Sequence, residues 1–312
     1  MPTQHQRLSS PVSLTRCAAA FRRLLSRRTL RRGPYQLTQK LGDGGCTEVY
    51  LARHRRQPTA DPVVVKTLAP SANLTMHRRQ LQREARLWSQ IHEHPNTVRI
   101  LDASRCSGRW PYFVMRYSAG ATLWETILQR HPLDLASRLN ILTQVCDFLQ
   151  HVHGHGIIHA DLAPKNILLI ASGGTAHHGV RVLDFGLAQE LDTIAGEAES
   201  PDAIRGTPAF MSPEACRSSD LLTPHSDIYS FGCLGYFLLS GEIPFSGATP
   251  TEICWKQIHA APPRLTDVTE AHSELDDLLA ACMAKSIADR PSSMDVIALQ
   301  LHSISCKIAP RS

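Results

Sequence analysis

The sequence predicts an α+β fold in two lobes: a small antiparallel sheet with one helix, then a larger, mainly helical lobe. Two observations indicate the sheet. The run Val63–Lys66 is rich in β-branched residues, and the glycine-rich stretch Leu41–Tyr50 lies between alternating apolar segments, as in a hairpin. The helical lobe is indicated by apolar residues at helical spacing over 135–152. They are Leu135, Leu139, Leu142, Val145, Leu149 and Val152.

The order of these elements predicts where each lobe begins and ends. We expect the sheet lobe over residues 35–115, a hinge over 116–120 and the helical lobe over 121–305. Residues 1–34 are expected to form a basic, flexible tail, and residues 306–312 a short C-terminal tail. A chain of 312 residues, 43% of them hydrophobic, is long and apolar enough to bury sizeable cores.

The net charge of +5 is unevenly distributed along the chain. Residues 1–42 hold nine basic residues and no acidic one, which leaves 24 basic against 28 acidic residues in the remainder. The body of the chain is therefore mildly acidic. It gives no reason to expect a nucleic-acid partner.

The basic tail contains an amphipathic stretch. Arg22 and Arg23 lie beside one apolar helical face, formed by Leu14, Ala18, Phe21 and Leu25. Such a stretch can make a weak contact with an anionic membrane surface or with a partner protein, and it also mimics an organelle transit peptide. The interpretation that we favour is a disordered or weakly helical tail with none of these roles.

Cysteine usage and the apolar runs indicate the compartment. Nine cysteines occur without Cys-x-x-Cys pairs, as expected of reduced thiols in cytoplasm. No apolar run approaches the ~20 residues of a membrane span. The richest stretch, Tyr229–Leu239, fits a buried core helix, and His151, His153 and His155 surround a helix end where no metal is expected. We therefore expect a cytoplasmic protein without a transmembrane segment.

The most informative segment runs from His159 to Asn166 and is followed by Asp184-Phe185-Gly186. The carboxylate of Asp161 can accept a proton from a hydroxyl nucleophile. Asn166 and Asp184, eighteen residues apart, offer hard oxygen ligands suited to Mg²⁺. A single Asp in a loop is usually a turn or cap residue, so the prediction rests on the whole set and its spacing.

A lysine and a glutamate upstream are expected to form an ion pair. Glu84 lies on the same face of a predicted helix, over 74–92, as Leu81, Trp88 and Ile91. An unpaired carboxylate on that apolar face would be costly, and Lys66 at the end of its strand is the natural partner. The alternative is a surface glutamate beside neighbouring arginines.

In this order the motifs resemble those of the eukaryotic-like (Hanks-type) protein kinase family, close to its bacterial serine/threonine branch. The resemblance covers roughly Tyr35 to Leu301. It implies ATP and Mg²⁺ as cofactors and transfer of phosphate to Ser or Thr hydroxyls of protein substrates, including the chain itself. Ser26 and Thr29, each preceded by arginines, are candidate sites of autophosphorylation. A nucleotide-binding pseudokinase scaffold and a small-molecule phosphotransferase are the alternatives.

The resemblance also assigns roles to individual residues. Catalysis would fall to Asp161 and Lys165, and Mg²⁺ to Asn166 and Asp184. The implied ATP-binding residues are Leu41, Gly42, Gly44, Val49, Val64, Lys66, Glu84, Met115, Tyr117 and Leu168. Those implied for substrate docking and its support are Thr207, Glu214, Asp227 and Arg290. The resemblance implies that Arg290 pairs with Glu214 and that Asp227 braces the catalytic loop.

The chain departs from the family pattern at five positions, which are Thr47, Val64, Ala160, Ala163 and Ser212. Thr47 replaces the third lid glycine and should stiffen the hairpin tip. Ala160 replaces the arginine that receives an activation-loop phosphate, and Ala163 replaces the lysine that contacts the transferring phosphate.

A compensating charge follows in the same loop. Lys165 lies four residues after Asp161, from where its ammonium can reach the same phosphate oxygens. The pairing of Ala163 with Lys165 therefore favours a relocated cation. The alternative is an exposed loop lysine without a role.

Overall fold

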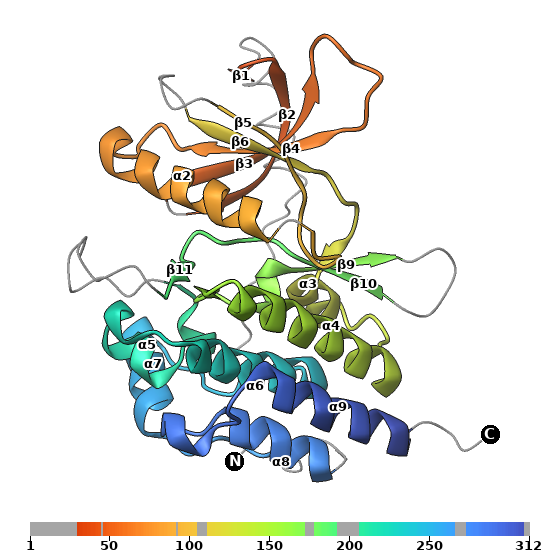
Figure 1. Cartoon of the computed structure of the whole chain (residues 1–312), viewed down its shortest axis with the longest axis vertical. Helices are drawn as coiled ribbons and strands as arrows, with labels where there is room; N and C mark the ends of the chain where they lie inside the picture. Colours follow the sequence, from red (N-terminus) through yellow and green to blue (C-terminus); the bar gives the residue numbers. More distant parts are fainter. Residues whose placement is uncertain are drawn as a thin grey trace, which may run out of the picture.

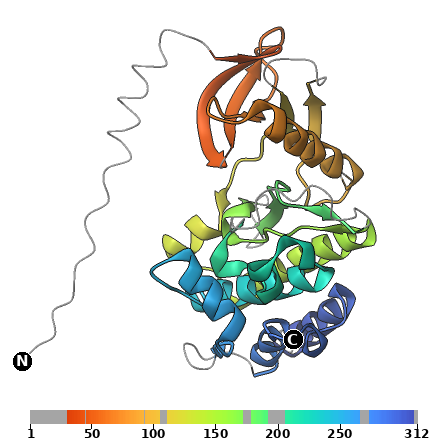
Figure 2. The same cartoon turned by 90° about the vertical axis from the view of Figure 1, so that its left-hand side faces the viewer.

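The computed structural model describes residues 30–44, 46–91, 93–104, 111–171, 178–191, 206–265 and 273–308. The predicted N-terminal amphipathic stretch, Ser26 and Thr29 lie outside these residues. Figures 1 and 2 show a lobe built on a sheet above a lobe built mainly of helices. The predicted α+β, two-lobed fold is confirmed.

The sheet lobe is made from a strand-rich first part of the chain. It contains β1 (Arg31–Arg32), β2 (Tyr35–Gly44), β3 (Thr47–His54), β4 (Val63–Leu68), α2 (Leu74–Gln90), β5 (Ile100–Ala103) and β6 (Tyr112–Arg116). Within the described residues the six strands form one antiparallel sheet in the order β1-β2-β3-β4-β6-β5. The glycine-rich segment is the β2–β3 hairpin, as predicted, with Gly44 opposite Thr47 at its end.

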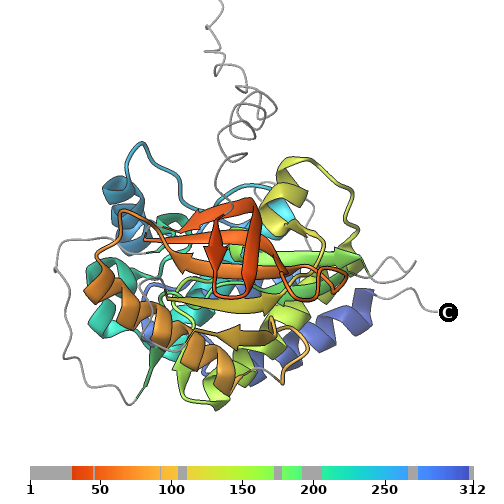
Figure 3. The same ribbon diagram turned by 90° about the horizontal axis from the view of Figure 1, so that it is seen from above.

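The two faces of this sheet contribute to two different cores. Alternate residues of a strand point to opposite faces, so Val63 and Val65 join a small cluster with Tyr35, Leu37, Tyr50, Ala52 and Val114. The other face carries Phe113 and Met115, which belong to the large core that continues into the helical lobe. Seen from above, α2 runs alongside the strands (Figure 3). Its buried side, with Leu81, Leu87 and Trp88, packs into the same large core.

The helical lobe begins after a short connection. Its first part contains β7 (Ala121–Thr122), α3 (Leu123–Leu128), α4 (Leu135–Gly154), β8 (Ile157–Ile158), η1 (Pro164–Asn166), β9 (Ile167–Ala171), β10 (His178–Val182) and β11 (Gln189–Glu190). Its second part contains η2 (Pro208–Phe210), α5 (Pro213–Arg217), η3 (Ser219–Leu221), α6 (Pro224–Ser240), α7 (Pro250–His259), α8 (Ser273–Cys282), η5 (Ile287–Asp289) and α9 (Met294–Ile308). The short strands pair as β10-β9-β7 and β11-β8.

The central helix of this lobe is α6, which contains the predicted core stretch 229–239. Its side chains are buried from Ser226 to Leu238, as expected of a helix that is apolar all round. It contacts α4 on one side and α8 on another. This fully enclosed helix provides a rigid support for the loops that carry the polar site residues.

No helix in the described part of the chain combines the length and apolarity that a membrane span requires.

Candidate functional site

A buried lysine lies between two carboxylates where the lobes meet. Lys66 Nζ is 2.6 Å from Glu84 Oε1 and 2.7 Å from Asp184 Oδ1. The side chains of Lys66 and Glu84 are 7% and 2% exposed, whereas that of Asp184 is 36% exposed. The predicted Lys66–Glu84 pair is therefore confirmed. The contact with Asp184 brings the strand lysine to the predicted metal-binding motif.

Burial and proximity shift the pKa values of these three groups in different directions. Burial alone would lower the pKa of Lys66, but the charges of Glu84 and Asp184 raise it. Burial raises the pKa of Glu84 to about 7, even though the Lys66 ammonium opposes this. For Asp184, burial would raise the pKa, but the charge of Lys66 and hydrogen bonds from Lys66 and Gly186 lower it to about 2. Asp184 therefore ionises more readily than Glu84, and its side chain is the more exposed of the two.

The Asp184-Phe185-Gly186 motif is also anchored by its other residues. The ring of Phe185 is 4.6 Å from that of Trp88 and 4.8 Å from that of His159, measured between centroids. Gln80 Nε2 of α2 donates to the Gly186 carbonyl at 3.0 Å. Helix α2 therefore contacts the motif through an amide and an aromatic side chain in addition to Glu84.

Strand register aligns several predicted ATP-binding residues on one face of the sheet. Gly42 lies opposite Val49, and Val49 opposite Lys66. Val64, two residues before Lys66, lies opposite Met115. Because directly paired residues of antiparallel strands share a face, these side chains point to the side of the sheet where Lys66 meets Asp184.

The hairpin tip and the hinge show two local constraints. Thr47 Oγ1 donates to the Gly44 carbonyl at 3.0 Å, which supports the expected stiffening of the tip. At the end of the hinge, a Cβ on Gly120 would lie 2.2 Å from the Leu169 carbonyl oxygen, so only glycine fits there. Of the remaining predicted ATP-binding residues, Leu168 is half-buried on β9, and Leu41 and Tyr117 are exposed.

The catalytic carboxylate candidate is held by neighbouring polar groups. Asp161 Oδ1 accepts from Thr207 Oγ1 at 2.8 Å, and Oδ2 accepts from Asn166 Nδ2 at 3.0 Å. Gly206 adopts a φ of +110°, and a Cβ there would lie 3.4 Å from Asp161 Oδ1. The structure therefore brings together Asp161, Asn166 and Thr207, three residues that the sequence assigned to different roles.

The loop before Asp161 is held by hydrogen bonds to the side chain of Asp227 on α6. One Asp227 oxygen accepts from the backbone nitrogen of His159 at 2.8 Å, and the other from that of Ala160 at 2.9 Å. His153 Nε2 donates to Asp227 Oδ2 at 2.8 Å. Burial would raise the pKa of Asp227, but the hydrogen bonds from His153 and the backbone lower it. These bonds hold Ala160 at a φ of +63°, a left-handed conformation that costs a non-glycine residue about 1 kcal/mol.

The two loop positions that depart from the family pattern have opposite environments. Ala163 is fully buried at the start of η1. Lys165 is exposed over 53% of its side chain, and its Nζ lies 3.7 Å from Asp161 Oδ2. The loop therefore carries a cation beside Asp161, and it is presented from position 165.

The predicted metal ligands have suitable chemistry for Mg²⁺. Two hydrogen bonds of the Asn166 amide group come from Nδ2, so Oδ1 would be the atom available to a cation. Asp184 adds an ionised carboxylate. In the ranges that the structure describes, no group of three or more His, Cys, Asp or Glu side chains could hold a metal ion. Two protein oxygens, completed by phosphate and water, are a common arrangement for Mg²⁺.

The segment after Gly206 is fixed to the helical lobe by buried polar contacts. Ser230 Oγ of α6 donates to the Phe210 carbonyl at 2.7 Å, and Gln257 Nε2 of α7 donates to the Pro208 carbonyl at 3.0 Å. Arg290 donates to both oxygens of Glu214, at 2.8 and 2.9 Å, in the arrangement expected from the sequence. Thr207 is thereby fixed beside Asp161.

Comparison with known proteins agrees with this geometry. The family model for the protein kinase domain matches residues 35–301. The chain belongs to the protein kinase family.

The similar kinases include several bacterial serine/threonine-protein kinases. PknB of Mycolicibacterium smegmatis is 31% identical over 265 residues, which cover 83% of this chain and 40% of that protein. Pkn1 of Myxococcus xanthus is 34% identical, covering 85% of this chain and 37% of its own length, and pkn3 of the same organism is 31% identical, covering 86% and 50%. This kinase chain therefore spans half or less of the length of these relatives.

One departure from the kinase pattern has a local explanation. Ser212 replaces the alanine of the Ala-Pro-Glu motif, and its Oγ accepts a hydrogen bond from the backbone nitrogen of Ala215 at 3.2 Å. It thus caps the N-terminus of α5, a position for which serine is well suited.

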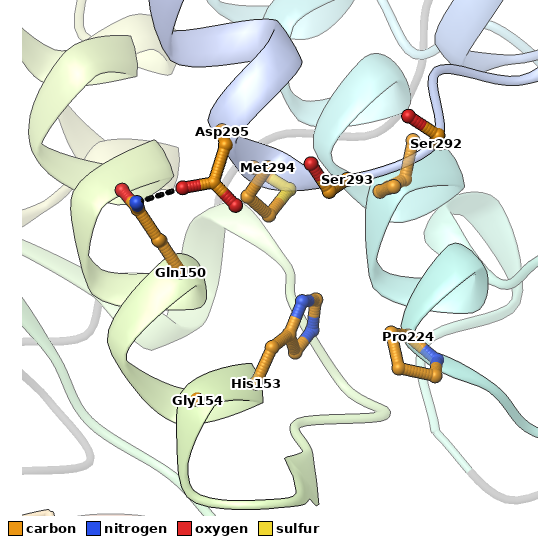
Figure 4. Close-up of a pocket in the computed structure, with 9 residues that line it drawn as sticks. Gln150, His153, Gly154, Pro224, Ser292, Ser293, Met294 and Asp295 are labelled. Carbon is orange, nitrogen blue, oxygen red and sulfur yellow. Dashed lines mark hydrogen bonds between the residues drawn. The ribbon is translucent and has the colours of Figure 1, made fainter.

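A pocket of about 430 Å³ lies behind the loop 159–166, between α4, α6 and the start of α9 (Figure 4). Its walls include His153, Pro224 and Ser293, and Gln150 donates to Asp295 across one side. None of the predicted ATP-binding residues lines it. It adjoins the His153–Asp227 brace and is separate from the Lys66 cluster.

Three residues make contacts around the candidate site that sequence reasoning did not find. His153 was assigned only to a helix end among other histidines, yet it binds Asp227. Gln80 lies one turn before Glu84, and this spacing could have indicated its contact with Gly186. Arg86 was considered only as a neighbour of a surface glutamate, yet it reaches across to Glu190.

Proposed function

We propose that the chain is a serine/threonine protein kinase, which transfers the γ-phosphate of ATP to Ser or Thr hydroxyls of proteins, including its own. The observation that carries this proposal is the hydrogen-bonded frame around Asp161. Asn166 and Thr207 fix its two oxygens, and the Lys66 cluster supplies the nucleotide side of the site. Catalysis of phosphoryl transfer is mainly positioning and electrostatics, which is what this frame offers.

The proposal gives each charged residue a task. Asp161 orients the acceptor hydroxyl and takes its proton. Lys66 and Lys165 offset the negative charge of the phosphates from the two sides of the site. When bound to Asn166 and Asp184, Mg²⁺ supplies further neutralising charge to the phosphate oxygens. The ATP contacts assigned to Leu41, Gly42, Gly44, Tyr117 and the other predicted residues belong to this proposal as well.

A nucleotide-binding scaffold without catalysis is the second candidate function. It is favoured by Thr47, Ala160 and Ala163, three departures from the usual kinase motifs. A small-molecule phosphotransferase is opposed by the segment 206–214. The family resemblance implies that this segment docks peptides, and its backbone is hydrogen-bonded to α6 and α7.

One assay separates these candidates. Purified protein is incubated with labelled ATP, Mg²⁺ and a generic basic protein, and the product is examined by phosphoamino-acid analysis. The proposal expects phosphoserine or phosphothreonine on the added protein or on the chain itself. The scaffold would instead be identified if the protein bound ATP but gave no more labelled product than an Asp161→Asn control.

Partners and location extend the proposal beyond the kinase domain. The relatives named above are serine/threonine-protein kinases, and on that similarity we assign protein substrates to this chain. The cytoplasmic location rests on the cysteine pattern of the sequence. A weak membrane or partner contact of the basic tail concerns residues outside the described part of the chain.

A further inference from the structure

A second ion pair joins α2 to the helical lobe, away from the reacting groups. Arg86 Nη2 on α2 donates to Glu190 Oε2 on β11 at 2.5 Å. Gln90 Nε2, one turn further along α2, donates to the other oxygen, Glu190 Oε1, at 3.4 Å. Both carboxylate oxygens of Glu190 are thus bound by the same helix.

The position of Glu190 connects this contact to the catalytic loop. In the β11–β8 pair, Glu190 lies opposite Ile157 and Gln189 opposite Ile158. The backbone nitrogen of Leu191 adds a bond to the Gly156 carbonyl at 2.8 Å. Strand β8 leads directly into His159, so Glu190 ties α2 to the strand from which the catalytic loop starts.

On α2 itself, Arg86 and Glu84 point in different directions. Residues two apart on a helix are separated by about 200° around its axis, so their side chains lie on nearly opposite faces. Glu84 is buried and faces Lys66, whereas Arg86 is 60% exposed and faces β11. The helix is therefore fixed from inside by Lys66 and from outside by Glu190. An outward swing or rotation of α2 that separates Glu84 from Lys66 would also separate Arg86 from Glu190.

We propose that Arg86 and Glu190 form a positioning pair, which holds α2 in the orientation where Glu84 reaches Lys66. The fixed carboxylate of Glu190 provides this restraint without any covalent modification of the chain. The inference deepens the proposed kinase function and rests on it, because the value of the Lys66–Glu84 pair to the reaction is part of that proposal.

The exposure of the pair sets the size of the expected effect. Exposed ion pairs are screened by salt and shift an equilibrium by up to about fivefold. The pair therefore makes a small contribution to the orientation of α2, beside the larger one from the contacts of Glu84 and Gln80. Its effect should be largest at low ionic strength.

The test compares Arg86→Gln and Glu190→Gln with Arg83→Gln as a matched control. Arg83 is on the same helix and forms no ion pair with any residue that the structure describes. At low salt we expect Arg86→Gln and Glu190→Gln to lower the phosphotransfer rate by roughly two- to fivefold. The loss should shrink as salt is raised, and Arg83→Gln should behave as the wild type.

A charge exchange distinguishes positioning from general destabilisation. Arg86→Glu alone places two carboxylates together and should lower the rate by about tenfold at low salt. The double variant Arg86→Glu/Glu190→Arg restores an ion pair with reversed polarity, and it should recover most of the rate. Failure of the double variant to recover, together with equal rates for Arg86→Gln and Arg83→Gln, would overturn the inference.

A second measurement does not depend on activity. Backbone hydrogen exchange of α2 and β11 should be faster by roughly two- to fivefold in Arg86→Gln and unchanged in Arg83→Gln. If the wild type transfers no phosphate, the proposed function fails, and this exchange measurement alone decides whether the pair holds α2. Equal exchange in both variants would show that Arg86 and Glu190 do not restrain the helix.

Discussion

Lys66 and Lys165 carry the same charge on two sides of the site, and the protein holds them in contrasting ways. Lys66 is 7% exposed and lies within 2.7 Å of two carboxylates. Lys165 is 53% exposed and lies 3.7 Å from one carboxylate. A buried cation must be paired and fully placed by packing, whereas an exposed one can be moved at little expense.

This contrast bears on the proposal that the loop cation is relocated while the strand lysine keeps its usual place. Moving Lys66 along its strand by one residue would turn its side chain to the opposite face of the sheet and leave Glu84 buried without a partner. In the proposed function the loop presents its cation from the exposed position 165, because position 163 is fully buried in this chain.

The largest effect on turnover is expected from a change in the loop that leaves the nucleotide side of the site intact. Asp161→Asn keeps the shape of the side chain but removes the proton acceptor, so the turnover rate should fall by up to roughly 10⁴-fold. ATP binding should be nearly unchanged, because Lys66, Glu84 and Asp184 are untouched. The measurement is phosphotransfer beside nucleotide binding for the same preparation.

The matched variant for that experiment is Asp184→Asn. It removes the anion that contacts Lys66 and the predicted Mg²⁺, so both metal-dependent ATP binding and turnover should weaken. If both variants lost ATP binding equally, the two sides of the site would not be separable in this way.

The next effect is on stability and concerns the buried ion pair between Glu214 and Arg290. Burial would raise the pKa of Glu214, but the hydrogen bonds and charge of Arg290 lower it from its ordinary value of 4.5. Glu214→Gln leaves the Arg290 charge buried without its anion, and should reduce the free energy of unfolding at pH 7 by about 3–5 kcal/mol. Denaturant unfolding of wild type and variant checks this.

The sign of the pH dependence follows from the lowered pKa. Glu214 contributes stability that is fully present above pH 4.5 and is lost as the pH falls through its lower folded pKa. The difference between wild type and Glu214→Gln should therefore narrow as the pH falls below 4.5. Glu274→Gln, which breaks the exposed pair with Lys307, serves as the control and should change stability little. A constant difference at every pH would contradict this role for the Glu214 charge.

A smaller effect is expected from the relocated cation. Lys165→Ala should lower turnover by roughly 10²-fold, the scale of one lost transition-state contact, with KM for ATP changed much less. Lys165→Arg keeps a cation on an exposed side chain and should retain a large part of the rate. A silent Lys165→Ala would make Lys165 an ordinary surface residue and would strengthen the scaffold alternative.

The smallest effect on the phosphotransfer rate should come from removing any phosphate carried by the chain itself. Ala160 offers no positive charge to a phosphate on the activation segment, so phosphatase treatment should change the rate by less than about twofold. Thr193 and Ser200, between the Asp184 motif and Gly206, are the hydroxyls that we would expect to carry such a phosphate, and Arg205 is another cation that could receive it. All three lie outside the described residues. A large loss of rate after phosphatase treatment would show that another group receives the phosphate.

The sequence predicted those parts of the fold that depend on local periodicity. The β2–β3 hairpin, α2 and the buried stretch of α6 each have a clear apolar pattern, and the motifs placed Lys66 opposite Glu84 and Arg290 opposite Glu214. Helix α2 ends at Gln90, two residues before the predicted end, because helix ends depend on capping and packing more than on periodicity.

The contacts that the sequence did not predict join residues far apart in the chain. Arg86 and Glu190 are separated by 104 residues, and His153 and Asp227 by 74. Neither partner in such a pair has a pattern that distinguishes it from a surface charge or a helix-end histidine. Only the tertiary fold, which brings α2 within hydrogen-bonding reach of β11 and packs α4 against α6, brings these groups together.

The core shared by the two lobes has a consequence for how the chain can be divided. Phe185, with Trp88 of α2 on one side and Phe148 of α4 on the other, lies within one continuous apolar cluster. A fragment ending at the hinge would keep Trp88 but lose Phe185 and Phe148, and would expose the part of the cluster that faces the helical lobe. Exposing that apolar surface should destabilise the fragment. The hinge therefore separates the two sides of the site, but the shared core should make the two lobes fold and resist proteolysis as one unit.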